Sequence, residues 1–170
     1  MNGLKWDTTH VVFVPEMDDE HKEIFDSLAA FQAAVSKQAP RSEIAGLTDV
    51  LKARIADHLS HEERIMRASR YAAYRWHKKA HDGARRRVRE FIALIEEGDR
   101  DAGPGLVEYL TTWLHDHMRL ADMMLGAFLR NHQRSLYRVT FRAGTKPADA
   151  CRWFDSKGQP FDPSQNNSGY

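Results

Sequence analysis

The stretch HLSHEERIM, residues 58–66, places two histidines and two glutamates within six positions of a chain that otherwise has a helical pattern. Helices at a protein surface carry charge freely, so the direction of these side chains matters. His58 and Glu62 are four residues apart, which places them on one face of a helix, about one turn apart. That face also carries isoleucine and leucine, so we expect both side chains to point into the core. His61 and Glu63 lie off this face, and we expect them in solvent or at the edge.

Four segments repeat apolar residues at spacings of three and four, which is typical of helices with one buried face. The repeating positions span residues 17–35, 44–65, 77–95 and 110–128. Pro40, the YAAY sequence at 71–74 and the sequence GDRDAGPG at 98–105 separate them. Short connections between long helices place neighbours antiparallel. The sequence therefore predicts an all-α fold, an antiparallel up-and-down four-helix bundle with an N-terminal arm and a non-bundle C-terminal tail.

Length and composition narrow the class of protein. A chain of 170 residues can bury one sizeable core. Its formal net charge of +1 gives no strong attraction to nucleic acid or to an anionic membrane. The single cysteine, Cys151, excludes an internal disulfide, and no apolar run reaches transmembrane length. We expect a cytoplasmic protein with no nucleic-acid partner and no membrane insertion.

The composition changes after residue 131, where the helical period fades and glycine, proline, serine and asparagine increase. We therefore expect two parts, a bundle with its N-terminal arm at 1–131 and a partly irregular extension at 132–170. The sequence SLYRVTFRAG, residues 135–144, alternates enough to allow a short strand.

Polar residues interrupt the apolar face of every predicted helix. An unpaired buried polar group costs about 1–3 kcal/mol, and an ionised carboxylate costs more. Six such groups would rival the whole stability of a domain, about 5–15 kcal/mol. A metal would satisfy them together, since imidazole and carboxylate are ligands and bundle cores commonly hold such sites. The six are His21, His58, Glu62, His77, His81 and His117.

Four motifs together resemble the hemerythrin family, and in particular its bacterial members. They occur in the family's order and spacing: DDEHKEIF at 18–25, H58 with E62-E63 and M66, H77-x3-H81, and H117-x4-D122. The resemblance covers about residues 4–131. One HxxxH pair is a weak signal, whereas the full set is specific.

The resemblance implies a non-haem di-iron centre with an oxo or hydroxo bridge. The seven ligands implied are three histidines on one iron, two histidines on the other and two bridging carboxylates: His77, His81 and His117; His21 and His58; Glu62 and Asp122. One position then stays open on the two-histidine iron, where dioxygen would be held as hydroperoxide.

Asp122 fits an ideal helix poorly. It follows His117 by five residues, about 140° around an α-helix, so periodicity alone would select Ala121. Either the carboxylate reaches sideways, or the helix widens locally into a π-type turn, which often marks a functional site. The ligand role of Asp122 therefore depends on the family resemblance.

A mostly apolar pocket is expected beside the two-histidine iron, lined by Leu59, Trp113, Leu114, Met118 and Leu125. Histidines off the buried faces are expected to be ordinary polar residues: His10, His61, His115 and His132. The arginine-rich run at 84–91 is more typical of a solvated helix face than of an anion-binding site.

The function implied is reversible dioxygen binding, for storage or for delivery to an oxygen-consuming partner, and not an enzymatic reaction. Two alternatives stay open. The centre could sense oxygen or redox state and signal to a partner protein through the C-terminal tail, or it could reduce peroxide or nitric oxide. The absence of an acid–base residue among the expected pocket residues argues against the enzyme.

Overall fold

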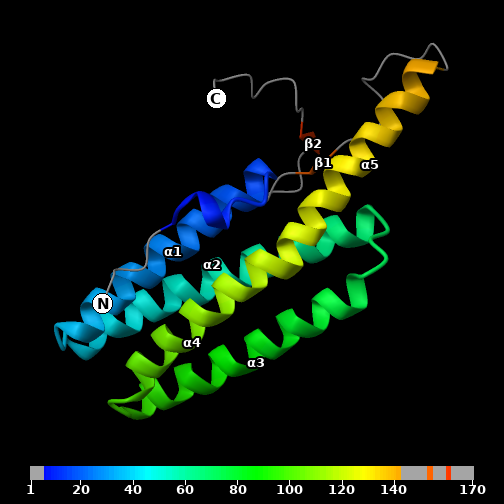
Figure 1. Ribbon diagram of the computed structural model, residues 1–170. Helices are drawn as coiled ribbons and strands as arrows, with labels where there is room; N and C mark the ends of the chain where they lie inside the picture. Colours follow the sequence, from blue (N-terminus) through cyan, green and yellow to red (C-terminus); the bar gives the residue numbers. More distant parts are fainter. Residues whose placement is uncertain (1–5, 143–152, 155–159, 162–170) are drawn as a thin grey trace.

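The computed structural model describes residues 6–142, 153–154 and 160–161. Long helices lie side by side and form a bundle (Figure 1). The helices of the bundle are α1 (Pro15–Ser36), α2 (Arg41–Ala68), α3 (Tyr74–Glu97) and α4 (Ala102–His117), and α4 continues through a π-helical turn, η2 (Met118–Asp122), into α5 (Met123–Arg142). A short 3₁₀ turn, η1 (Thr8–His10), precedes them. The predicted all-α antiparallel bundle is confirmed.

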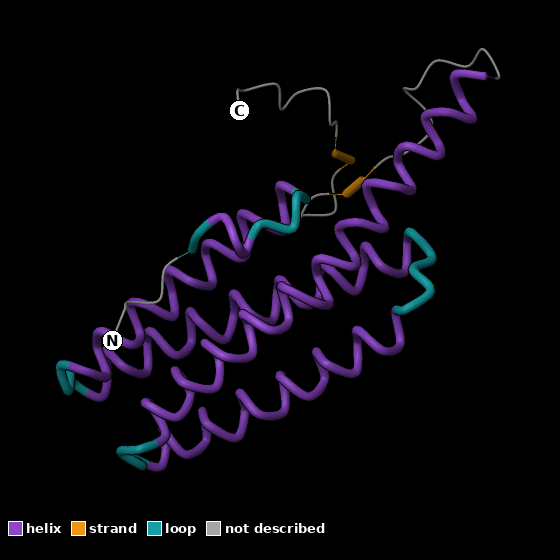
Figure 2. The backbone as a smooth tube through the Cα atoms, viewed as in Figure 1, coloured by secondary structure: helices purple, strands orange, loops and turns teal. Residues whose placement is uncertain are grey.

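Local sequence explains where the rods begin and end. Pro15 occupies the first turn of α1, where its missing N–H is no loss. Gly98 ends α3 in the left-handed conformation, with φ of 92°, which glycine adopts without strain. Pro40 immediately precedes α2. The loops therefore lie at the two ends of the bundle, and consecutive helices run antiparallel (Figure 2).

The apolar core forms two clusters, one toward each end of the bundle. The larger cluster contains Leu28, Ile55 and Leu110, and the smaller contains Met17, Met66 and Leu129. On every rod the candidate ligands lie in sequence between residues of the two clusters. The polar layer is therefore enclosed by apolar side chains from both directions along the bundle.

The π-helical turn resolves the alternative left open by the spacing of His117 and Asp122. The backbone at Met118–Asp122 is π-helical, and regular α-helix flanks it on both sides. A π turn holds one more residue than an α turn, so it returns Asp122 toward the face that carries His117. Both side chains are buried.

The short strand that the alternation at 135–144 allows does not form over its described part, because α5 stays helical to Arg142. No proline or glycine interrupts the sequence between Gly126 and Gly144, so nothing in it forces the helix to end at 131. Further on, β1 (Trp153–Phe154) and β2 (Pro160–Phe161) pair antiparallel. The division of the chain at residue 131 falls inside α5 and stays a prediction.

The N-terminal arm, residues 6–14, is fastened to the bundle at Val12. This side chain is buried, and its backbone N–H donates to Asp18 Oδ1 at 2.8 Å. Its carbonyl accepts a hydrogen bond from Arg130 and lies so close to Gly126 that a Cβ there would collide with it. Among the described residues, no helix has the length and apolar character needed to span a membrane.

Candidate metal centre

The structure brings all seven residues named from the sequence into one buried layer. His21 lies on α1, His58 and Glu62 on α2, His77 and His81 on α3, His117 at the end of α4 and Asp122 in η2. Glu62, His77, His81 and Asp122 have no exposed surface, and the most exposed of the seven, His117, keeps 7%. The i, i+4 pairs on α2 and α3 point to one side, as their spacing predicted.

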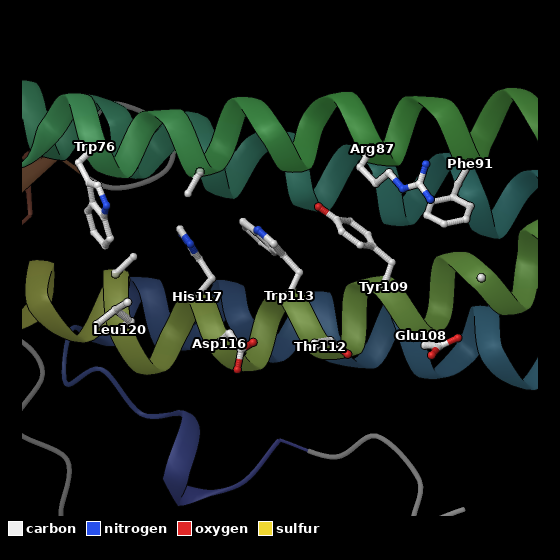
Figure 3. A pocket seen from close by; sticks show the side chains of 13 residues that line it. Trp76, Arg87, Phe91, Glu108, Tyr109, Thr112, Trp113, Asp116, His117 and Leu120 are labelled. Carbon is white, nitrogen blue, oxygen red and sulfur yellow. The ribbon is translucent and has the colours of Figure 1, made fainter.

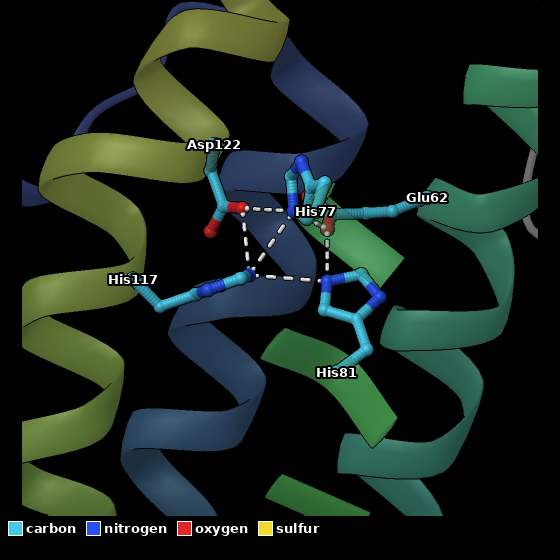
Figure 4. Close-up of side chains that lie close together, drawn as sticks. All are labelled: Glu62, His77, His81, His117 and Asp122. Carbon is cyan, nitrogen blue, oxygen red and sulfur yellow. Dashed lines mark hydrogen bonds and ion pairs between the residues drawn. The ribbon is translucent and has the colours of Figure 1, made fainter. Parts of the chain in front are cut away.

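Three histidines converge through their Nε2 atoms, and His77, His81 and His117 are here called the three-histidine group (Figure 4). The Nε2 atom of His117 lies 3.1 Å from that of His77 and 3.0 Å from that of His81. Two imidazole nitrogens bound at right angles to one first-row metal, each at about 2.1 Å, are about 3 Å apart. The observed separations match this geometry.

His21 and His58 form a second set, called the two-histidine group. Their Nε2 atoms are 3.1 Å apart. The His21 Nε2 atom lies 3.3 Å from Asp122 Oδ2, and the His58 Nε2 atom lies 3.8 Å from Glu62 Oε1. This group therefore also has convergent nitrogens and two carboxylate oxygens.

The two carboxylates lie between the groups, and each offers one oxygen to each side. Glu62 Oε2 is 3.3 Å from His77 Nε2 and 3.1 Å from His81 Nε2, whereas its Oε1 faces His58. Asp122 Oδ1 is 3.1 Å from the Nε2 atoms of both His77 and His117, whereas its Oδ2 faces His21. Such a division of oxygens is what two neighbouring metal positions with shared carboxylate ligands require.

The carboxylate oxygens of this layer are not satisfied by hydrogen bonds from the described residues. Both oxygens of Glu62 and both of Asp122 are buried, lie near imidazole nitrogens and still have no partner with hydrogen-bond geometry among the described residues. Unpaired buried carboxylate oxygens are costly, and cations compensate them. Neutral imidazoles and carboxylates are suitable donors for iron, so the residues present fit a non-haem iron site.

Glu20 orients the two-histidine group from outside. Its Oε2 lies 3.0 Å from His58 Nδ1, and its Oε1 lies 2.7 Å from His61 Nδ1. An ionised carboxylate only accepts, so both Nδ1 atoms must donate. In His58 this tautomer leaves the Nε2 lone pair free to face the carboxylates of the buried layer. The expectation that His61 is solvent-exposed or marginal is wrong: it keeps only 2% of its surface exposed.

Glu63 performs the same task for the three-histidine group. Its Oε1 lies 3.3 Å from His81 Nδ1 and 2.5 Å from Arg85 Nη1. The expectation that Glu63 is solvated is also wrong, since it is 7% exposed. Periodicity missed Glu20 and Glu63 because it identifies a core-facing stripe, and these side chains reach the ligands from its border.

The electrostatics of the metal-free layer follow from buried opposite charges. Burial acts to lower the pKa of His77, but the close approach and negative charge of the Asp122 and Glu62 carboxylates outweigh it and raise this pKa to about 9. Burial and Asp122 act to raise the pKa of Glu62, yet the neighbouring histidines hold it below its usual value. Burial likewise opposes ionisation of Asp122, and His117 keeps its pKa well below the usual value. The layer thus keeps its carboxylates ionised and attracts cations.

The five residues expected to line a pocket divide between the two apolar clusters. Leu59, Leu114 and Met118 belong to the larger cluster, with Trp113 packed against it, whereas Leu125 belongs to the smaller one. Leu59 and Leu125 have no exposed surface. Trp113 stacks on the ring of His117, with 4.3 Å between ring centroids and 15° between planes.

Comparison with known families identifies this arrangement. The model of the hemerythrin HHE cation binding domain matches residues 12–129. The chain belongs to the hemerythrin family. The matched residues include all seven of the buried layer, and the resemblance noted from the motifs is confirmed.

Individual hemerythrins agree with the family match. Hemerythrin from Themiste dyscrita is 31% identical over 117 residues, which cover 69% of this chain and 86% of that protein. Bacteriohemerythrin from Pseudomonas aeruginosa (strain LESB58) is 29% identical over 154 residues, which cover 91% and 99%. A crystal structure of a hemerythrin variant superposes with a TM-score of 0.65 at 26% identity and covers 76% of this chain and 98% of that one.

Proposed function

We propose that this protein binds dioxygen reversibly at a non-haem di-iron centre and serves as an oxygen store or as a carrier to an oxygen-consuming partner. The observation that carries the proposal is the division of each carboxylate's two oxygens between two groups of convergent histidines. In this assignment His77, His81 and His117 would hold one iron and His21 and His58 the other, and Glu62 and Asp122 would offer one oxygen to each. The hemerythrin relatives support this choice of metal.

An iron pair supplies two electrons that can be lent to dioxygen and recovered on its release. The side chains of the protein orient the metal ligands and balance the charge of the metal ions. Glu20 and Glu63 fix the tautomers of His58 and His81, so that their Nε2 lone pairs face the metal positions. Glu62 and Asp122 bring two negative charges, which offset part of the charge of the metal ions.

The two-histidine group has fewer protein ligands, and we assign the ligand-binding position to it. The pocket beside it is proposed to be lined by Leu59, Leu114, Met118 and Leu125. Trp113, the fifth residue expected there, stacks on His117 of the three-histidine group. Apolar walls exclude water and offer no group that could donate a proton to bound oxygen. Such walls favour release of dioxygen over its reduction, which supports a binding protein rather than an enzyme.

The test is a cycle of oxygenation. The protein is loaded with ferrous iron without air and its iron content is measured. Oxygen is then admitted, the visible spectrum is recorded, and the sample is purged with inert gas. We expect two irons per chain and a charge-transfer band that appears with oxygen and vanishes on purging over several cycles.

Two results would contradict the proposal in different ways. A chain that binds no iron would remove the metal centre. A band that collapses at once to a stable oxidised spectrum, with turnover of peroxide or nitric oxide under a reductant, would replace the carrier with an enzyme.

A further inference from the structure

A groove of about 640 Å³ lies between α3 and α4, on the outside of the three-histidine group. Figure 3 shows Tyr109, Trp113 and His117 in a row along α4, with their rings directed toward α3. Between Trp76 and Arg87, α3 contributes only Ala80 to the lining, and this small side chain leaves the middle open. The metal centre does not require this groove.

One end of the groove is bordered by exposed apolar side chains. Trp76 on α3 keeps 48% of its surface exposed, and Leu120 in η2 keeps 56%. Met124, one turn beyond Leu120, keeps 47%. Large apolar side chains clustered at a surface usually mark a contact with another macromolecule.

The other end of the groove carries opposite charges on its two sides. Arg87 on α3 lies over the ring of Phe91, with 4.4 Å from its guanidinium carbon to the ring centroid. Phe91 in turn lies 6.0 Å from the ring of Tyr109, whose neighbour along α4 is Glu108. Arg87 and Glu108 therefore lie at the same height on opposite sides (Figure 3). Among the described residues, none forms an ion pair with Glu108.

The wider surface repeats this division of charge. The α3 side belongs to the arginine-rich run at 84–91, in which Arg86 and Arg89 are also exposed. Arg87 pairs with Glu90 on the same helix at 2.9 Å, but the four arginines of the run outnumber this one glutamate. The α4 side adds the exposed carboxylate of Asp116. One side of the groove is therefore basic and the other acidic.

We propose that this groove is the interface of a symmetric homodimer. A twofold axis along the groove places α3 of one copy over α4 of the second copy at equal height. Arg87 then faces Glu108 of the second copy, and Trp76 faces Leu120 of the second copy. An axis across the groove would place α3 over α3 and oppose two basic surfaces. The charges therefore select the first arrangement, in which one surface complements itself.

The dimer would also change the surroundings of the metal layer. His117 and the partly buried ring of Trp113 line the floor of the groove. A second copy over the groove would cover this side and close the nearest solvent approach to the three-histidine group.

Sedimentation equilibrium of the full chain, from about 1 µM to about 1 mM, tests the proposal. We expect reversible dimerisation that weakens as salt rises, because exposed charge pairs are screened. Arg87→Glu and Glu108→Arg should each raise the dimer Kd at least tenfold. The double variant should return it to within about threefold of the wild-type value, because the pair is restored with exchanged signs.

Further variants separate this interface from association through another face of the bundle. Trp76→Ser should raise the Kd at least tenfold while circular dichroism shows an unchanged helix content. The exposed α2 residues Lys52 and Val50 provide the matched controls Lys52→Glu and Val50→Ser, which should leave the Kd unchanged. A monomer at every concentration would overturn the proposal. The proposal would also be overturned if Arg87→Glu left the dimer Kd unchanged, or if the double variant did not return the Kd toward the wild-type value.

Discussion

The three-histidine group and the two-histidine group share the same two carboxylates, but the protein encloses them differently. The first lies against the α3–α4 groove, where the ring of Trp113 covers His117. The second lies beneath the N-terminal arm, where the ring of Trp6 is 5.8 Å from that of His21. The supporting glutamates differ as well, because Glu63 pairs with Arg85 whereas Glu20 is shared between two histidines.

This difference separates two tasks that one buried layer must combine. In the proposed di-iron centre Glu62 and Asp122 would be ligands of both metals, so they would determine whether the centre forms. The surroundings of each histidine group then determine what can reach it. Substitutions in the shared carboxylates, and then in the surroundings of each group, test this separation.

Asp122→Ala should have the largest effect, because one substitution removes a ligand from both groups. We expect the iron content to fall from two per chain to below one, with loss of the oxygen-dependent band, as measured by iron assay and visible spectroscopy. His21→Ala is the comparison. It should lose the two-histidine iron and keep the other, so equal losses in both variants would show that the positions are not independent.

Leu59→Ala opens the apolar wall next to His58. Leu59 is fully buried, so the substitution should destabilise the fold by about 2–4 kcal/mol in urea denaturation. It should also speed oxidation of the ferrous protein in air by admitting water. Leu51→Ala removes an equally buried leucine two turns away in the same cluster. It should destabilise similarly and leave the oxidation rate unchanged.

The metal-free protein should lose stability as the pH rises from 6.5 to 9. The pKa of His77 is raised to about 9 in the fold, above its unfolded value of about 6.5. Its proton therefore stabilises the fold fully below pH 6.5, and this contribution disappears as the pH passes 9. Urea denaturation should record a loss on the order of 1–3 kcal/mol. The iron-loaded protein should show no such loss, because metal replaces the proton.

Glu20→Gln tests the support of the two-histidine group alone. Glutamine replaces one of the two acceptor oxygens with an NH2 donor, so the Nδ1–H of either His58 or His61 then faces a donor. In competition with a chelator, we expect iron at the two-histidine group to bind about tenfold more weakly. We expect no change in iron binding at the three-histidine group. Glu23→Gln alters an exposed glutamate on the same helix, paired with Arg54, and should have no effect. Equal weakening of both irons by Glu20→Gln would contradict the assignment.

Much of the fold and of the buried layer could be predicted from the sequence. The spacing of apolar residues predicts the four helices of the bundle. It also predicts that the five histidines on the same helix faces are buried, because burial depends on the position of a residue around the helix. Glu62 followed from its spacing to His58. Asp122 did not, since its position depends on a local change of helical type that no propensity encodes.

The apolar periodicity could not predict the roles of Glu20 and Glu63 for a different reason. Glu20 reaches His58 and His61 on another helix, and Glu63 reaches His81 and Arg85 on α3. Such contacts depend on how two rods are rotated against each other, which one rod's sequence does not specify. The alternation at 135–144 is weak, and α5 continues to Arg142 because no helix-breaking residue precedes Gly144.

The π turn at Met118–Asp122 has a consequence for anyone who would transplant this centre. A straight helix offers side chains for one face at steps of three or four, never at five. A scaffold assembled from regular α-helices would therefore present His117 and its carboxylate on different faces, even with every ligand copied. The graft must carry one additional residue in its last rod, and a motif search that permits only regular spacings will overlook relatives built in this way.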